Sequence, residues 1–462
     1  MSSSKRDVTI LQPWLGDLKA GYDRNITSQP NYFLHSTSAS LITTSNLHSL
    51  HLGTGESIYT SLLPLIQSAN EELILVTCFW ATSATQKLVN DALRTLSEKG
   101  ISKGRKMRVR ICFSSSSILQ KLLHPQTLNG KVYPPESWQS TLNLPHPDQL
   151  QGLDMQVKSI FLLPFSVMHP KFIIVDRKAA VLPSCNVSWE DWFEGAVTLT
   201  GPVVSCFVNF WKEFWAQQKD RDELVRLSVA SEDQDLSAEI SQDSQGQLPL
   251  HTPLSLKDIP TIFLVSPHHR NPDFRLPWQE HSAPPPTPLN TFLLRSLLSA
   301  EREVYIQTPN LTAAPILEAI LSTLKRGINM HIVTSERLMI LEQLVTAGTT
   351  TSRCIGKLIS RYQDISFTSS PSDLEAGRAK PGRLKIDYFV PATRNGYGEP
   401  QQSHLKCTIV DQELVILGSG NLDRASWYTS QELGVAFFDQ DFAQKLLESL
   451  TSVLQGRLKS VL

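Results

Sequence analysis

The sequence contains one pattern of segments twice, and this repeat most constrains the fold. The stretch IQSANEELILVT at residues 66–77 returns as LLSAEREVYIQT at residues 297–308. In the first copy the helical pattern TQKLVNDALRTLSEKG and the apolar run VRICF follow. In the second copy the corresponding segments are ILEAILSTLKRG and INMHIVTS. Helices that alternate with short apolar strands favour an α/β sheet. We therefore expect an internal duplication of an α/β half.

Each copy also contains a histidine, a lysine and an aspartate at the same spacing. The stretch HPKFIIVD at residues 169–176 returns 235 residues later as HLKCTIVD at residues 404–411. One such stretch alone suits a strand that enters the core from a polar edge, but two at corresponding points of a repeat indicate a shared function. Side chains two apart on a strand share a face, so His and Lys should project together, whereas the Asp should face the other way and be structural. The residues are His169, Lys171 and Asp176 in the first copy and His404, Lys406 and Asp411 in the second.

Three further polar residues follow each motif at similar distances. A serine lies 15 positions and an asparagine 17 positions after each histidine, and a glutamate comes later. These residues are Ser184, Asn186 and Glu194 in the first copy and Ser419, Asn421 and Glu432 in the second. Because the agreement extends beyond the three-residue motif, the two copies are expected to build similar polar surroundings.

The two motifs resemble the HxKxxxxD, or HKD, signature of the phospholipase D superfamily. The run GSGNLDRASWYTSQELGVAF after the second motif is similar to that of its cardiolipin-synthase-like, phosphatidyltransferase branch. The resemblance covers roughly residues 55–228 and 259–450. It departs from the usual pattern at Pro183 and Cys185, where small residues are common, and at Ser430, where Asn is common. The resemblance implies an α/β fold of two similar α/β/α halves, packed about a pseudo-two-fold axis with the active site at their interface.

The residues of the two motifs suit attack on a phosphodiester. Such a group is anionic, and two lysine ammonium groups can offset its charge without a metal. A neutral imidazole, with an ordinary pKa of about 6.5, can attack phosphorus, and a protonated imidazole can donate to the leaving alkoxide. The resemblance implies that a covalent phosphohistidine forms on His169 and that His404 is the general acid and then the base, although the reverse order is chemically allowed. No metal or other cofactor is expected.

The remaining polar residues take their expected roles from the same resemblance and chemistry. Glu194 and Glu432 are expected to orient the histidines, and the sequence leaves open which histidine each one serves. The serines and asparagines are expected to donate hydrogen bonds to the non-bridging phosphate oxygens. Trp189, which lies between the asparagine and the glutamate of the first copy, could line a lipid-accepting cleft or be an ordinary aromatic of the core or rim.

Composition narrows the substrate class without deciding it. A formal net charge of −1 does not suit a generally basic nucleic-acid-binding protein, although it allows a basic cleft. Together with the synthase-like segments it favours a phospholipid substrate, either hydrolysed or used for phosphatidyl transfer. A phospholipase D-type nuclease is the alternative, and a non-enzymatic binding module is disfavoured by the complete polar sets. Peripheral membrane contact is compatible with a lipid substrate, and no obligatory protein partner is inferred.

Composition also divides the chain into four parts. Residues 1–45, rich in Ser and Thr, are expected to be a loosely ordered or surface-wrapped extension, and residues 229–258 have the acidic, polar composition of a linker. The two halves are then residues 46–228 and 259–462. Six scattered cysteines and an N-terminus without a signal-like apolar run favour an intracellular protein with free thiols. No apolar run approaches the length of about 20 residues that spans a bilayer, so a cytoplasmic or peripherally membrane-associated location is expected.

Overall fold

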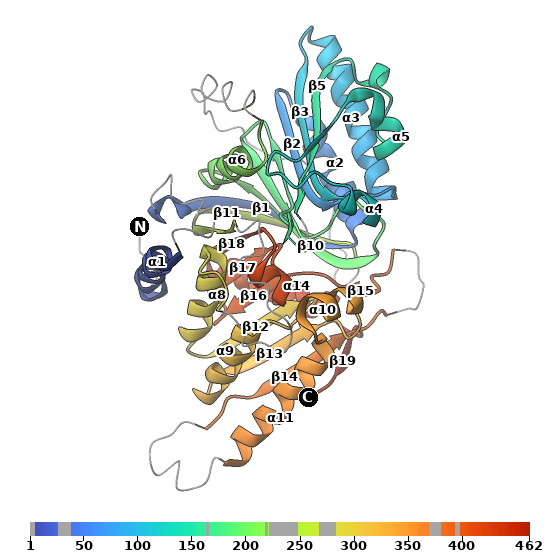
Figure 1. The fold of residues 1–462 in the computed structure, drawn as a ribbon. Coiled ribbons are helices and arrows are strands. Elements are labelled where there is room, and N and C mark those ends of the chain that lie inside the picture. The colour runs from blue at the N-terminus through green and yellow to red at the C-terminus, as the bar shows by residue number, and fades with distance from the viewer. Residues whose placement is uncertain are drawn as a thin grey trace. The chain divides into compact units, whose positions relative to one another are not determined.

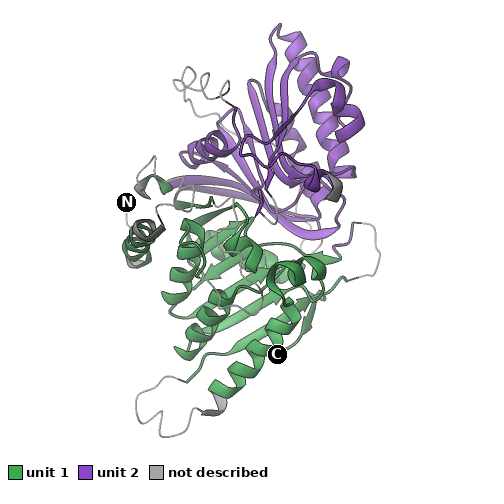
Figure 2. Cartoon of the chain, viewed as in Figure 1, with its two compact units in different colours: residues 1–42, 260–396, 401–462 green, residues 43–259, 397–400 purple. Residues whose placement is uncertain are grey.

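The computed structural model divides the chain into two compact units (Figure 2). Unit 1 comprises residues 1–42, 260–396 and 401–462, and unit 2 comprises residues 43–259 and 397–400. The residues that the structure describes are 5–25, 38–162, 166–217, 220, 248–267, 283–368, 380–392 and 398–462. Most of the stretch predicted as a linker, residues 229–258, lies outside the described residues, and its last part belongs to strand β11 (Leu250–Ser266).

Unit 2 contains a mixed sheet of eight described strands (Figure 1). The central strands β2, β3 and β5 are parallel, and every other pairing between neighbours in this sheet is antiparallel. In spatial order the strands are β1 (Ile42–Gly53), β10 (Trp192–Thr200), β9 (Ala179–Pro183), β8 (Phe172–Val175), β2 (Glu72–Phe79), β3 (Met107–Ser115), β5 (Leu153–Ser159) and β4 (Lys131–Tyr133).

Unit 1 contains a sheet with the same order and the same parallel centre. Its strands, in spatial order, are β11, β18 (Glu432–Phe438), β17 (Leu414–Gly418), β16 (Cys407–Val410), β12 (Glu303–Thr308), β13 (Asn329–Thr334), β14 (Leu384–Phe389) and β19 (Leu458–Ser460). Only the last strand comes from a different place in the chain, since β4 precedes its neighbour β5 whereas β19 follows β14. The predicted α/β fold with two similar halves is therefore confirmed.

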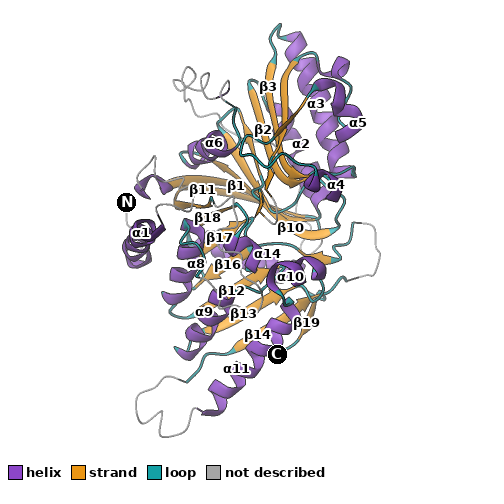
Figure 3. Cartoon of the chain, viewed as in Figure 1, coloured by secondary structure: helices purple, strands orange, loops and turns teal. Residues whose placement is uncertain are grey.

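Helices cover both faces of the sheet of unit 2 (Figure 3). Helices α2 (Gly55–Ser68) and α3 (Ala84–Ser102) pack on the face that carries Leu73, Leu75 and Ile173. Helix α6 (Val203–Phe214) packs on the opposite face, where Phe207 lies 5.6 Å from Phe172, measured between ring centroids. The shorter elements of this unit are α4 (Ile118–Leu122), η3 (Pro135–Ser137), α5 (Trp138–Leu142), η4 (Pro147–Leu150), β6 (Phe161–Leu162) and β7 (Ser166–Val167).

Neighbouring residues of strand β18 show the same layering in unit 1. The ring of Phe437 meets Phe442 of helix α14 (Gln440–Val453), while the ring of Phe438 meets Phe292 of helix α8 (Pro288–Leu298). Side chains alternate between the faces of a strand, so these two helices cover opposite faces. The other elements of unit 1 are α1 (Lys5–Asn25), η2 (Ser38–Leu41), α9 (Ala314–Lys325), α10 (Ile340–Ala347), α11 (Thr351–Thr368), β15 (Gln402–Ser403) and α13 (Arg424–Tyr428).

The N-terminal part of the chain differs from the expected loose extension because α1 is a helix packed on unit 1. Its apolar residues Ile10, Trp14 and Leu18 recur every four residues and are buried. The indole Nε1 of Trp14 donates to the carbonyl of Pro288 over 3.2 Å, at the start of α8. The Ser- and Thr-rich flanks of this segment hid a short periodic pattern.

Among the described residues no helix is long and apolar enough to cross a membrane. All six cysteines are free thiols, and five of them are buried.

Candidate active site

Each His-x-Lys pair lies just before a strand rather than within it. Strand β8 begins at Phe172 and β16 begins at Cys407, so both pairs precede the first strand residue. The backbone there brings the lysine Nζ back to the carbonyl oxygen of its histidine, at 3.1 Å for Lys171 and 2.6 Å for Lys406. This differs from the expected extended strand, because the lysine side chain folds toward the backbone of the residue two positions earlier.

Both lysines of the motifs are buried cations. Lys171 is 0% exposed and Lys406 is 4% exposed. An ammonium group has three donors, and the carbonyl of the histidine uses one of them. Because a buried charge is costly unless polar or charged groups surround it, such lysines mark a place where an anion is favoured. His404 is also buried, whereas His169 is half-buried.

The aspartates of the two motifs hold a turn in place. The Oδ1 and Oδ2 atoms of Asp176 accept three hydrogen bonds, of 2.7 to 2.9 Å, from the backbone N–H groups of residues 70–72. Asp411 accepts the equivalent three, of 2.7 to 2.8 Å, from residues 301–303. Both aspartates have a positive φ, 51° and 53°, as in the tight turns that join hairpin strands. Each carboxylate thus ties the β8–β9 or β16–β17 hairpin to the segment before the first parallel strand.

The serine and the glutamate that follow each motif form a buried pair. The hydroxyl of Ser184 donates to Oε2 of Glu194 and accepts from the N–H of Gly195 at 2.9 Å. Ser419 donates to Oε2 of Glu432 at 2.5 Å and accepts from the N–H of residue 433 at 3.0 Å. A hydroxyl has a single proton, and here it is directed at a carboxylate. The expected donation from serine to phosphate would therefore require this proton to change partner.

The two asparagines contact different partners. Oδ1 of Asn186 accepts from the N–H of Phe79, at the end of β2, over 3.3 Å. Asn421 donates from Nδ2 to Oδ2 of Asp423 at 3.0 Å, and its Oδ1 is buried without a hydrogen-bond partner in the described part of the chain. Each asparagine therefore sits at the same end of its sheet as the histidine of its own motif, with one side-chain polar atom outside these contacts.

The departure from the family pattern at Cys185 has a local compensation. A Cβ atom at Gly420, the corresponding position of unit 1, would come within 3.0 Å of the Leu289 side chain. In unit 2 the Cβ of Cys185 lies 3.4 Å from the position that a Cβ would occupy at Gly55, the first residue of α2. The extra side chain at Cys185 is accommodated because its helical neighbour is a glycine.

The sequence reasoning did not single out Glu190 as a site residue. Its carboxylate accepts a short hydrogen bond from the hydroxyl of Ser188. Burial raises the pKa of Glu190, and the charge of Glu194 adds to this, while the Ser188 hydrogen bond and the Lys171 charge oppose it. These electrostatic neighbours place Glu190 within reach of the polar groups of the first motif. Its position four residues before Glu194 is a signal that the search for paired residues in the two copies overlooked.

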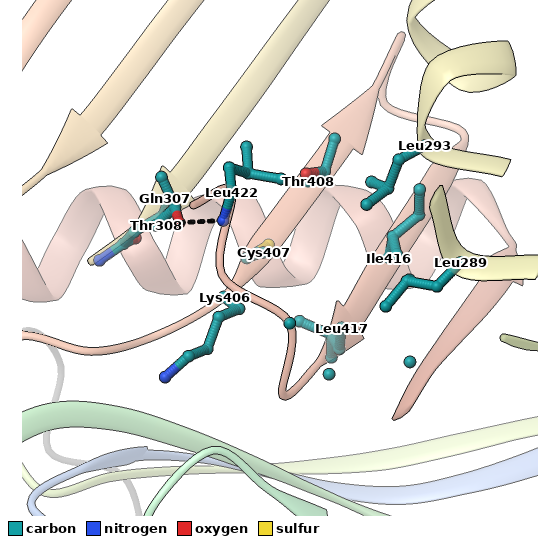
Figure 4. A pocket seen from close by; sticks show the side chains of 13 residues that line it. Leu289, Leu293, Gln307, Thr308, Lys406, Cys407, Thr408, Ile416, Leu417 and Leu422 are labelled. Atoms are coloured by element: carbon teal, nitrogen blue, oxygen red, sulfur yellow. Dashed lines mark hydrogen bonds between the residues drawn. The ribbon is translucent and has the colours of Figure 1, made fainter. Parts of the chain in front are cut away.

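A small cavity of about 20 Å³ adjoins the second motif within unit 1 (Figure 4). Leu289 and Leu293 of α8 and Ile416 of β17 line one side, and the Lys406 side chain extends away from them. The Oγ1 of Thr308 accepts from the N–H of Leu422 at 3.2 Å. The base of the second motif is therefore apolar, and the ammonium group points away from it.

No group of three or more His, Cys, Asp or Glu side chains in the described part of the chain is placed to hold a metal ion. The buried cations next to both histidines are the lysines of the motifs.

Three comparisons relate this chain to known proteins. Residues 293–454 match the family model described as cardiolipin synthase, PLD-like domain. The solved structure of phosphatidylserine synthase from Haemophilus influenzae is 14% identical, with a TM-score of 0.52, covering 90% of this chain and 89% of that one. The phospholipase D family member Nuc from Salmonella typhimurium is 20% identical over 37% of this chain and 90% of its own, with a TM-score of 0.26. A comparison with curated proteins gives no match.

The match to residues 293–454 contains the second motif and the residues that follow it. The likeness to the synthase from Haemophilus influenzae extends over both units and shows a shared fold. The family match also supports the predicted phospholipase D-type enzyme class. The predicted resemblance to the phospholipase D superfamily and its cardiolipin-synthase-like branch is therefore confirmed, with the family match carried by residues 293–454.

Proposed function

We propose that this protein is a metal-independent phosphodiesterase or phosphatidyltransferase that acts on phospholipids through a covalent phosphohistidine. The observation that carries the proposal is the duplication of one polar set, in which each unit holds a buried lysine against its histidine and a serine against its glutamate. Two such sets supply two histidines and two cations, which is what a two-step displacement at an anionic phosphorus requires.

In the proposed first step, His169 attacks phosphorus and His404 protonates the leaving alkoxide. A P–N bond forms, the P–O bond breaks, and the released alcohol takes the proton. In the second step His404 removes a proton from water or from an acceptor alcohol, whose oxygen displaces the imidazole. Half-burial of His169 suits a group that must meet substrate, and the buried Lys171 beside it offsets the phosphate charge. The step requires both motifs to face one phosphorus atom.

The glutamates are proposed to orient the histidines, and the serines to hold the glutamates. The Ser184–Glu194 and Ser419–Glu432 hydrogen bonds support the second role, because each fixes one carboxylate oxygen. The proposed donors to the phosphate oxygens are then the lysines and the asparagines, with the serines contributing only if their protons change partner. The aspartates are proposed to be structural, which their backbone hydrogen bonds support.

The phospholipid substrate is favoured by the family match to a cardiolipin synthase domain. A panel of phosphatidylglycerol and phosphatidylcholine, with and without glycerol, and single-stranded DNA tests the choice. Phosphatidic acid would indicate hydrolysis, and a new phosphatidyl ester would indicate transfer. Cleaved DNA with intact lipid would replace the proposal by the nuclease alternative.

The assignment of the nucleophile is tested by trapping the adduct. His404→Asn should accumulate a phosphatidyl group on His169 when it reacts with substrate, because the second step lacks its base. His169→Asn should give no adduct, and His331→Asn, a histidine of unit 1 outside the motif, should turn over like the wild type. Peptide mass mapping locates the adduct, and a label on any residue other than His169 would overturn the assigned order.

A further inference from the structure

Exposed aliphatic side chains concentrate at one place on unit 2. Leu122 and Leu123 at the end of α4 are 62% and 75% exposed, and Leu128 and Val132 are 46% and 42% exposed. Single exposed apolar residues are ordinary, but a group within eleven residues marks a surface that is covered in use. We refer to these four residues as the leucine rim.

The leucine rim borders a pocket at the end of the sheet where the first motif lies. The cavity has a volume of about 370 Å³, within the size range of small-ligand sites. Leu123 belongs to its lining, together with Trp80 and Thr82 after β2, Gln120 of α4, and Lys131 and Tyr133 of β4. Hydroxyl and amide groups mixed with aromatic rings suit a ligand with polar and apolar parts.

Backbone contacts connect this pocket to the first motif within unit 2. Trp80 forms a β-bridge with Val187, and the N–H of Ala81 donates to the carbonyl of Val187 at 2.9 Å. Asn186, the residue before Val187, accepts from the N–H of Phe79. Trp189, two residues after Val187, is 67% exposed. The pocket wall and the segment that carries Asn186 are therefore one hydrogen-bonded structure.

The charge of the rim is complementary to an anionic lipid surface. The stretch from residue 114 to residue 133 contains Lys121 and Lys131 and no acidic residue. The Nζ of Lys131 lies 4.9 Å from the ring centroid of Tyr133, beside the pocket. Cations next to exposed aliphatic groups are typical of surfaces that bind the interface of an anionic bilayer.

The duplication repeats the feature in unit 1. Helix α10 follows β13 as α4 follows the equivalent strand β3, and it exposes four aliphatic side chains. They are Ile340, Leu341, Leu344 and Val345, with exposures between 38% and 79%. Two copies with different sequences therefore keep apolar side chains exposed after the same strand, which a chance surface feature would not explain.

We propose that the leucine rim is the surface through which this protein docks on an anionic phospholipid bilayer, beside the pocket next to the first motif. The inference deepens the proposed function and rests on it for its purpose, since a docked rim brings lipid head groups to that end of the sheet. The aliphatic side chains enter the interface, and Lys121 and Lys131 lie at the level of the phosphates.

The test is sedimentation of the full chain with unilamellar vesicles of phosphatidylcholine and phosphatidylglycerol in equal amounts. Leu122→Ser/Leu123→Ser should weaken partitioning at least tenfold, and Leu128→Ser/Val132→Ser is a second, independent variant if the first fails to fold. Ile101→Ser is the matched control, because Ile101 is 61% exposed at the opposite end of β3 and should change partitioning less than twofold. Raised salt should weaken binding of the wild type.

A second measurement separates docking from the proposed chemistry. Short-chain phosphatidylglycerol, used as monomers in solution, should be turned over by the rim variants within twofold of the wild type. Absence of turnover of these monomers by the wild type would refute the proposed function, while the vesicle measurement would still decide docking. Equal partitioning of the wild type and both rim variants, or no vesicle binding by the wild type, would overturn the inference. Loss of a dimer in the rim variants with unchanged vesicle binding would assign the surface to a second copy instead.

Discussion

The aspartates of the two motifs offer the sharpest test of which motif residues are structural. We consider Asp176→Asn and Asp411→Asn. Both positions have a positive φ, a conformation that Asn adopts nearly as readily as Asp, so the substitution changes the carboxylate and leaves the turn unstrained. Each carboxylate accepts three backbone hydrogen bonds. An amide keeps one acceptor oxygen and places an NH2 group against the remaining donor.

The expected loss of stability follows from these hydrogen bonds. A hydrogen bond to a charged group contributes about 1.5 to 3 kcal/mol, and a neutral one about 0.5 to 1.5 kcal/mol. Losing about 1 kcal/mol at each of three bonds gives a decrease in the free energy of unfolding of about 3 kcal/mol. Asp411 is 1% exposed and Asp176 is half-buried, so the loss should be larger at Asp411.

Urea unfolding and steady-state turnover on the phospholipid identified as substrate measure the two sides of this prediction. The folded variants should keep kcat within about threefold of the wild type, since less than 1 kcal/mol of transition-state stabilisation would be lost. Glu71→Gln is the control, because Glu71 lies in the same loop with an exposed side chain and should change stability by less than about 0.5 kcal/mol. Unchanged stability with a hundredfold loss of kcat would show that the aspartates act in catalysis.

Three further outcomes are expected. Ser184→Ala and Ser419→Ala should each lower kcat about tenfold to a hundredfold, as loss of a supporting partner often does, with little change in KM; an effect on KM alone would instead indicate direct contact with substrate. Activity should survive EDTA, and a strict requirement for a divalent ion would contradict the role given to the lysines. His51→Asn should reduce acid sensitivity: burial and then the neighbouring His251 lower the pKa of His51 to about 3, so the unfolded chain takes up a proton below pH 6.5 that the folded chain does not, and about 2 kcal/mol is lost by pH 5. An unchanged pH slope of urea unfolding in that variant would refute this account.

The fold followed from local patterns that the chain contains twice. Alternation of helical and strand periodicity is a local property, and it was sufficient to predict the parallel strands β2, β3, β12 and β13 and the helices between them. The helix α1 was missed because its three buried positions stand in a polar segment and become meaningful only when α8 is present to cover Trp14.

The contacts of the site residues depend on strand pairing that the sequence does not contain. Ser184 meets Glu194 because β9 and β10 are paired, with the N–H of Ser184 bonded to the carbonyl of Gly195 at 2.8 Å. Similarly, the fold of each lysine toward its histidine carbonyl depends on where the strand begins. The residue types and their spacing could therefore be predicted, whereas the choice of hydrogen-bond partner for each hydroxyl and ammonium group could not.

The two halves have diverged most clearly on one sheet face, and this divergence can be measured. The registers of β3 and β13 place Arg110 of unit 2 at the position of His331 in unit 1. Arg110 is 3% exposed and pairs with Asp220 at 2.8 Å and with Asp154 at 3.0 Å. His331 instead contacts Asp387 at 2.7 Å, beside an open groove of about 1090 Å³.

Asp220→Asn should therefore destabilise unit 2 by about 3 to 5 kcal/mol, because it removes the buried partner of a buried guanidinium group and leaves only the half-exposed carboxylate of Asp154. Asp387→Asn is the matched variant in unit 1. Its partners there are Lys385, which is 44% exposed, and His331, whose pKa is lowered chiefly by burial, so neither is left as a buried cation. We expect a loss of about 1 kcal/mol or less in that variant. Equal losses from the two substitutions, measured by urea unfolding, would show that burial of the cation does not decide the difference, and the closed face of unit 2 would then need another explanation.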